Sequence, residues 1–190
     1  YAWNTLTRLG FFLTIAFLLS RLLTVLEHER EIAHKDYLTG ALNSLFFYNV
    51  LQMEINRSLR YKNLFTIAYI DLDNIKTVND EFGHATGDEV LCFVVNQIKN
   101  SLRKVDVVAR LGGDEFAMYL PGMPDKAQAE SFFKRLFTQI DKISIPEMQG
   151  EKINVSLGAS LCSDKDGATF DTLYHEADAA MYESKKIVGN

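Results

Sequence analysis

The sequence predicts an α+β domain, in which helices alternate with a mostly antiparallel sheet, preceded by a helical extension. Short runs rich in β-branched and aromatic residues alternate with longer segments whose apolar residues recur at helical spacing. Two short apolar runs flank Gly112-Gly113 closely enough to form a hairpin, which makes those strands antiparallel. With 190 residues, 47% of them apolar and 24% charged, the chain can support one sizeable domain plus a short extension.

The expected elements follow in order along the chain. Helices are predicted where apolar residues have a period near 3.6, and strands where such residues form short runs. The expected helices are residues 45–60, 87–102, 127–143 and 169–186, and the expected strands are residues 65–72, 107–110, 116–120 and 153–161. The helix from residue 87 is expected to begin around Asp88 and Glu89, because acidic side chains favour the positive end of a helix dipole.

The first part of the chain differs from the rest, and we expect two units, residues 1–35 and 36–190. Residues 9–26 (LGFFLTIAFLLSRLLTVL) are apolar with the single charge of Arg21, which is close to the length of a bilayer span. Basic residues that follow this run would suit a cytoplasmic flank. This hypothesis places residues 36–190 in the cytoplasm, attached to the plasma (inner) membrane.

The alternative for the first unit is a helix that buries its apolar face against a partner helix. Residues 22–35 carry apolar positions on one side and charges elsewhere, which could form a short two-stranded coil. The chain opens on Tyr1 and not on Met, so we expect further sequence upstream.

Charge and cysteine content exclude some classes of protein. A formal net charge of -5 argues against a duplex nucleic-acid binder, which would need a basic face for the phosphates. A single nucleotide stays compatible, because a metal ion can supply positive charge locally. Cys92 and Cys162 lack CxxC spacing, so each is expected to be a buried, reduced thiol.

Two acidic clusters are candidates for a metal site. Asp71 and Asp73 end an otherwise apolar strand, and Asp114-Glu115 follows the Gly-Gly turn. Either cluster alone is weak evidence, but two clusters at strand ends of one sheet favour a cation. Carboxylate oxygens of this kind suit Mg²⁺ shared with substrate phosphates.

The segment between these clusters carries candidates for nucleotide binding. An Asn amide and an Asp carboxylate, here Asn79 and Asp88, can together read the edge of guanine. Lys76 could reach phosphate oxygens. For each residue alone, a solvated polar loop or a helix cap is the simpler interpretation. For His84 alone, a structural hydrogen bond is simpler than a catalytic role.

Four stretches in order resemble the signature blocks of the GGDEF family of diguanylate cyclases. They are DYLTGALN at residues 36–43, DLDNIKTVNDEFGHATGDEVL at 71–91, RLGGDEF at 110–116 and ADAAMYESKK at 177–186. The resemblance implies a ferredoxin-like palm domain of the nucleotidyl cyclase type. It also implies a homodimer in which each subunit holds one GTP, and the two GTP molecules become cyclic di-GMP and two pyrophosphates.

The resemblance also implies a role for each matching residue. Mg²⁺, with Mn²⁺ as a substitute ion, would be held by Asp71, Asp114 and the backbone carbonyl of Leu72. Phosphates would meet Lys76, which could stabilise the transition state, and Lys185. Guanine would be read by Asn79 and Asp88, with His84 near the nucleotide. Glu115 would accept the proton of the 3′-hydroxyl. Feedback inhibition by the product would act through Arg103 and Asp106, an RxxD motif whose simpler interpretation is a surface ion pair.

Some positions depart from the family pattern. Gly189 stands where a phosphate-contacting Arg is common, Ser44 replaces a common Arg, and Ile75 replaces a common Phe. These departures keep one alternative open, a catalytically degenerate domain that senses GTP or cyclic di-GMP. A cyclase that makes a mixed purine dinucleotide is a further alternative, against which Asp88 favours guanine.

Overall fold

The computed structural model describes residues 2–123, 125–143, 145–148, 152–162 and 169–188, without the side chains of residues 2–3, 5–6, 24–33, 170 and 183–188. The chain divides into two compact units, Tyr1–Lys35 and Asp36–Asn190.

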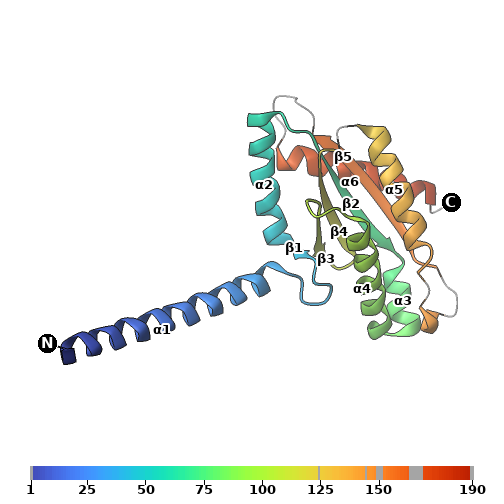
Figure 1. Cartoon of the computed structure of the whole chain (residues 1–190). Helices are drawn as coiled ribbons and strands as arrows, with labels where there is room; N and C mark the ends of the chain where they lie inside the picture. The colour runs from blue at the N-terminus through green and yellow to red at the C-terminus, as the bar shows by residue number, and fades with distance from the viewer. Residues whose placement is uncertain (1, 124, 144, 149–151, 163–168, 189–190) are drawn as a thin grey trace. The chain divides into compact units, whose positions relative to one another are not determined.

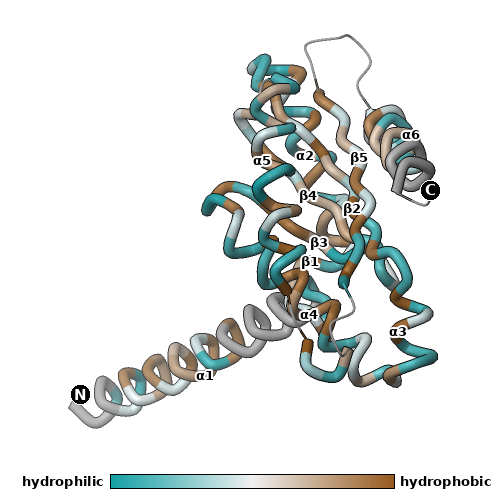
Figure 2. Tube along the Cα trace, turned by 90° about the vertical axis from the view of Figure 1, so that its right-hand side faces the viewer, coloured by the Kyte–Doolittle hydropathy of each residue, from teal (hydrophilic) through white to brown (hydrophobic). Residues whose placement is uncertain are grey.

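The first unit contains one uninterrupted helix, α1 (Ala2–His34). Its described apolar side chains are exposed, for example Phe11 at 65%, Phe17 at 64% and Leu23 at 59%. Figure 2 shows apolar residues along the middle of this helix. The sequence favoured a membrane span here; among the described residues, no helix is both long enough and apolar enough to cross a bilayer.

The second unit is built on a mixed sheet of five strands in the order β1-β3-β4-β2-β5 (Figure 1). The strands are β1 (Leu42–Asn43), β2 (Phe65–Asp73), β3 (Val107–Gly112), β4 (Glu115–Pro121) and β5 (Asn154–Cys162). β2 pairs antiparallel with both β4 and β5, β3 pairs antiparallel with β4, and β1 pairs parallel with β3. Without β1, the order and connections are those of a ferredoxin-like βαββαβ unit, as predicted.

Helices cover both faces of this sheet. One face carries α3 (Ile75–Phe82), α4 (His84–Ser101) and α5 (Lys126–Ile140), and the other carries α2 (Ser44–Tyr61) and α6 (Phe170–Val188). Figures 1 and 2 show α5 and α6 on opposite sides of β2 and β5. Because both faces are buried, β2 is apolar at nearly every position before its terminal acidic residues.

Local sequence explains where two helices begin and why α6 lies against the sheet. Asn43 caps α2 by accepting a hydrogen bond from the Phe46 amide, and Asp125 caps α5 in the same way. Gly158 in β5 lets α6 approach closely, because a Cβ at this position would overlap the backbone of Ala177 and Met181.

Some sequence-based predictions are wrong in detail. Helix α3 was not predicted, although Ile75, Val78 and Phe82 have helical spacing. Helix α4 begins at His84, after Gly83, and not around Asp88, which lies one turn inside it. Cys162 is buried and free, as predicted, whereas the free thiol of Cys92 is only partly buried.

Candidate active site at the sheet edge

The two acidic clusters meet at one end of the sheet. In the antiparallel pair of β2 and β4, Asp71 lies directly opposite Glu115. Directly opposed residues in such a pair project their side chains to the same face, with Cβ atoms about 5 Å apart. The Leu72 amide donates a hydrogen bond of 3.2 Å to the carbonyl of Asp114, which joins the turn to β2.

The turn that carries Asp114 depends on its glycines. Gly113 has φ of +54°, a conformation that favours glycine, and the register of β3 and β4 shifts between Arg110 and Gly112. This local irregularity places Asp114, which is half-buried, in the turn and Glu115, which is exposed, at the start of β4.

The donor set is suited to a hard cation that is shared with a ligand. Asp71 is 8% exposed, so its carboxylate lies at the rim of the core and not in free solvent. Among the described residues, no group of three or more His, Cys, Asp or Glu side chains is gathered closely enough to hold an ion alone. Two carboxylates and a backbone carbonyl fit Mg²⁺, which commonly completes its coordination with phosphates and water.

The second acid of the first cluster, Asp73, has a different contact. The Ser156 hydroxyl donates to both carboxylate oxygens of Asp73, at 3.1 and 3.0 Å. Asp73 therefore ties the end of β2 to β5, which supports a structural role for it.

The predicted base-reading residues are brought together by the packing of α3 against α4. The half-buried side chain of Asn79 lies against Gly87, where a Cβ would overlap its amide oxygen. Asp88 follows Gly87 and is exposed, as is His84 at the first position of α4. The structure therefore places an amide and a carboxylate on neighbouring helices at the end of β2.

The two predicted phosphate-binding lysines are placed less completely. Lys76 is exposed in the first turn of α3, which directly follows the acidic end of β2. Lys185 lies on α6, but its side chain is outside the described part of the structure, and so is Gly189.

The predicted inhibitory motif forms a tight ion pair beyond the end of α4. The Arg103 guanidinium donates to both oxygens of Asp106 at 2.8–3.1 Å, and its Nη2 also donates to the carbonyl of Pro121 at 2.8 Å. Asp106 is 1% exposed, whereas Arg103 is 53% exposed. The hydrogen bonds to Asp106 raise the pKa of Arg103 above its usual value. Asp106 therefore holds a guanidinium whose outer face remains open.

That open face borders a cavity of about 470 Å³ between the end of α4 and α5. The cavity is lined by Arg103, Met123, Phe132 and Arg135, among others. Arg135, whose guanidinium lies 5.7 Å from the centre of the Phe132 ring, was not predicted from the sequence. A lone Arg in an amphipathic helix carries no signal, because nothing in its spacing relates it to Arg103.

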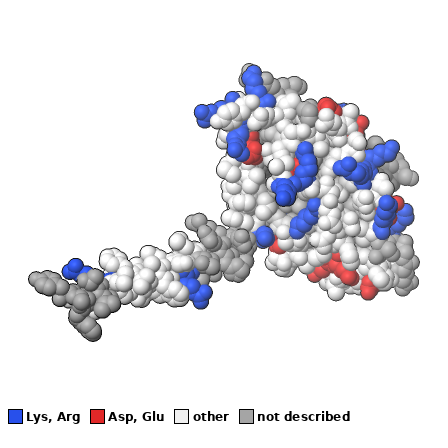
Figure 3. Space-filling model, in the orientation of Figure 1, with Lys and Arg blue, Asp and Glu red and all other residues white. Residues whose placement is uncertain are grey.

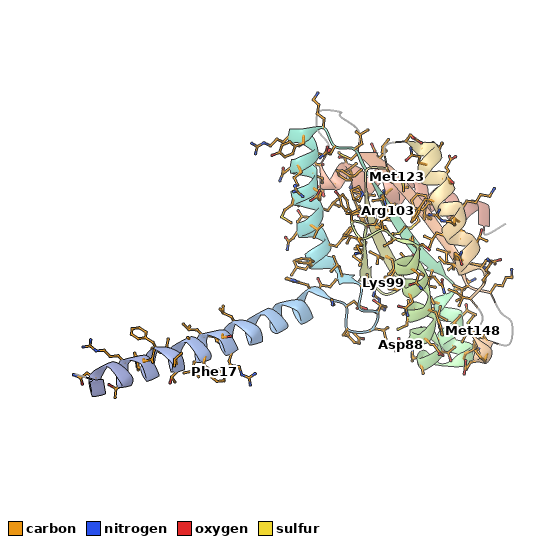
Figure 4. The ribbon with its side chains drawn as sticks, in the orientation of Figure 1. Phe17, Asp88, Lys99, Arg103, Met123 and Met148 are labelled. Atoms are coloured by element: carbon orange, nitrogen blue, oxygen red, sulfur yellow. The ribbon has the colours of Figure 1, made fainter. Side chains whose placement is uncertain are left out.

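The cavity and the acidic end of the sheet are far apart. Figure 4 shows Asp88 near one end of α4 and Arg103 beyond the other, with Met123 beside it. At a rise of about 1.5 Å per residue, the helix separates them by roughly 20 Å. In Figure 3, basic side chains are spread over the face that carries α4 and α5, and acidic ones gather at its lower edge, where α3 and α4 lie.

Comparison with known proteins identifies the family. The family model described as "Diguanylate cyclase, GGDEF domain" matches residues 33–190. The chain belongs to the GGDEF family. The resemblance of the four sequence blocks is therefore confirmed.

Curated relatives with this GGDEF domain are longer proteins. The chain is 36% identical over 148 residues to the uncharacterized protein YtrP of Bacillus subtilis, covering 78% of this chain and 24% of YtrP. It is 31% identical over 170 residues to the probable diguanylate cyclase DgcT of Escherichia coli, covering 88% and 37%. The chain thus spans 24% and 37% of the length of these two relatives.

Solved GGDEF structures share the fold. The coiled coil and GGDEF domain of DgcB from Caulobacter crescentus, in complex with c-di-GMP, has a TM-score of 0.83 at 26% identity, covering 90% of each chain. The GGDEF domain of TpbB from Pseudomonas aeruginosa has a TM-score of 0.72 at 33% identity, covering 80% of this chain and 89% of that one. The predicted palm-like fold is confirmed.

Proposed function

We propose that this GGDEF domain is a diguanylate cyclase that condenses two GTP molecules into cyclic di-GMP and two pyrophosphates. The observation that carries the proposal is the pairing of Asp71 with Glu115 at the end of the inner strands β2 and β4, beside the turn of Asp114. Two relatives, DgcT and the TpbB of P. aeruginosa, are named as a probable diguanylate cyclase and a diguanylate cyclase.

Substrate binding follows from the residues near this edge. Asn79 and Asp88 would pair with the guanine edge, the amide meeting N7 and O6 and the carboxylate accepting from N1–H and the 2-amino group. Lys76 would lie against the phosphates, where its ammonium opposes their charge. Lys185 would add a second cation from α6, and His84 would lie near the nucleotide.

Asp71, Asp114 and the carbonyl of Leu72 would hold Mg²⁺, or Mn²⁺ in its place. When bound, the ion would neutralise phosphate charge and lower the pKa of the attacking hydroxyl. Glu115 would accept the proton of the 3′-hydroxyl, whose oxygen then bonds to the α-phosphate of the other GTP while pyrophosphate leaves. Two such steps close the ring, and Lys76 would stabilise the charge that develops in each.

The symmetry of the product calls for two subunits. Each domain has one such candidate site for GTP, so two GTP-loaded domains would face each other about a twofold axis. Helix α1 is suited to promoting that encounter, because its exposed apolar side chains would be buried against a second copy. The DgcB structure includes a coiled coil next to its GGDEF domain.

The cavity beside Arg103 would bind the product, and the bound product would inhibit the enzyme. Cyclic di-GMP carries two phosphodiester charges, and the cavity offers the guanidinium groups of Arg103 and Arg135. Phe132 would add an apolar ring near a base. Asp106 would act on the product indirectly, by holding Arg103 in place.

Mg²⁺-dependent turnover of GTP, with the product identified by mass spectrometry, tests the proposal. Formation of cyclic di-GMP supports it. GTP binding without turnover would instead favour the degenerate sensor domain, and a mixed purine product formed when ATP is added would overturn the assigned specificity.

A further inference from the structure

The guanidinium of Arg110 links two segments that are far apart in the sequence. Its Nε and Nη2 donate to the carbonyl of Gly113 at 2.9 and 2.7 Å, and its Nη1 donates to the carboxylate of Asp36 at 3.2 and 3.3 Å. All three nitrogens are therefore engaged. The side chains of Arg110 and Asp36 are 12% and 14% exposed, so water competes little for these contacts.

This contact fixes one of the two peptide groups on either side of Asp114. The Gly113 carbonyl before Asp114 accepts from Arg110, and the Asp114 carbonyl after it accepts from the Leu72 amide. Because Gly113 is in the left-handed region beside a register shift, regular strand pairing does not by itself set the direction of its peptide. Arg110 supplies the missing constraint.

Asp36 is itself held firmly. Its Oδ1 accepts from the amide of Thr39 at 2.8 Å and from the Thr39 hydroxyl at 2.7 Å, and its own amide donates to the carbonyl of Ala41. We call residues 36–41 the opening loop. Burial alone would raise the pKa of Asp36, but the hydrogen bonds from Thr39 and Arg110 lower it overall.

The opening loop has a second anchor, which leads away from the turn. The Nζ of Lys99 on α4 donates to the carbonyl of Thr39 at 3.0 Å. This bond is made to the backbone of the opening loop, so Lys99 serves as the control for general loop stability.

We propose that Arg110 is a positioning residue for Asp114, and that Asp36 orients Arg110, so that the opening loop sets the geometry of the metal-binding turn. The proposal rests on the proposed role of Asp114 as a metal ligand. Asp36 is the first residue after the unit Tyr1–Lys35, so the opening loop directly follows that unit along the chain.

The test compares the full chain with the variants Arg110→Met, Arg110→Lys, Asp36→Asn and the control Lys99→Met. Arg110→Met is expected to lower kcat about 100-fold, the cost of misplacing a catalytic group by about 1 Å. The Mg²⁺ concentration for half-maximal rate should rise about 10-fold, as for the loss of a group that orients a metal ligand. The KM for GTP should change little, because the proposed guanine-reading residues Asn79 and Asp88 lie on α3 and α4 and not in the turn.

Arg110→Lys keeps the charge but not the planar fork, so it should recover only part of kcat. Asp36→Asn should shift kcat and the Mg²⁺ requirement in the same direction as Arg110→Met, and less. Lys99→Met should lower the urea midpoint with a parental Mg²⁺ requirement. The proposal is overturned if Arg110→Met has the parental kcat and Mg²⁺ requirement, or if Lys99→Met reproduces both changes.

A second pair of measurements does not need turnover. Amide hydrogen exchange at residues 112–114 should be faster in Arg110→Met, and Mn²⁺ binding in the presence of a non-hydrolysable GTP analogue should be about 10-fold weaker. If the parent binds Mn²⁺ and the analogue but makes no cyclic di-GMP, the proposed activity fails while these measurements still decide the positioning role. Unchanged exchange and Mn²⁺ affinity would overturn it.

Discussion

Gly87 on α4 lies against the side chain of Asn79 on α3, so closely that a Cβ at Gly87 would overlap the Asn79 amide oxygen. The substitution Gly87→Ala should therefore displace the amide from the position in which it would read guanine. We expect the KM for GTP to rise about tenfold, which corresponds to about 1.4 kcal/mol. Initial-rate kinetics over a range of GTP concentrations measures this change.

A double variant separates this effect from a general weakening of α4. In Asn79→Ala the overlap is absent, so adding Gly87→Ala should cost little further, and the two substitutions should be strongly non-additive. If the increases in KM caused by the two substitutions multiply in the double variant, Gly87 acts independently of Asn79.

Asp114→Ala should lower the rate of cyclic di-GMP formation by at least about 100-fold, as for removal of a group that stabilises charge in the transition state. The fold should persist, because Asp114 lies in a turn and its backbone contact with Leu72 remains. Circular dichroism and urea unfolding provide the control. A variant that is folded and fully active would remove this turn from the active site.

Arg135→Ala should weaken binding of cyclic di-GMP about tenfold or more, because hydrogen bonds to charged groups contribute about 1.5–3 kcal/mol. It is a cleaner test than Arg103→Ala, which would also deprive the buried carboxylate of Asp106 of its partner. Lys134→Ala is the matched control, since Lys134 is an exposed neighbour outside the cavity lining. Equal product affinity in the parent and Arg135→Ala, measured by calorimetry, would contradict the assignment of the cavity.

The lowered pKa of Asp36 predicts a dependence of stability on pH. A carboxyl whose pKa is lower in the folded state than in the unfolded state stabilises the fold above the unfolded pKa. This contribution should be present in full above the ordinary value of 3.8 and lost as the pH falls below it. The difference in free energy of unfolding between the parent and Asp36→Asn should therefore shrink below that pH. A difference in free energy of unfolding that grows as the pH falls would contradict the predicted direction.

Removing residues 1–32 should spare GTP binding but lower specific activity at nanomolar protein. In the proposed mechanism two GTP-loaded domains have to meet, and without the helix that encounter would depend on concentration alone. Raising the protein concentration should restore the activity of the shortened chain. Specific activity plotted against concentration for both chains, in detergent if the full chain requires it, measures the effect. Superimposable curves would show that the catalytic units pair without α1.

Most strands and long helices of the second unit could be predicted from the sequence, because their apolar spacing is set by burial on two faces of one sheet. Helix α3 was missed because only Ile75, Val78 and Phe82 mark its apolar side among polar residues that are also typical of loops. The start of α4 was misplaced because Gly83, and not an acidic residue, precedes it.

Some relationships within the candidate site could likewise be predicted from the sequence, and others could not. Asp71 and Glu115 could be related in advance, since both adjoin strands of one sheet and both lie in recognisable family blocks. The contact of Arg110 with Asp36 joins residues 74 positions apart, and Arg135 shares a cavity with Arg103 from a separate helix. Such relationships depend on side-chain reach and helix packing, which no local pattern in a single sequence records.

The length of α4 has a consequence for control of the proposed enzyme. The helix keeps Asp88 and Arg103 about 20 Å apart, so a product molecule beside Arg103 leaves the base-reading end open. More substrate would then not displace that product, and the inhibition would be noncompetitive. The concentration of the second messenger at which synthesis slows would then be set by its affinity for the distal cavity, whatever the supply of GTP.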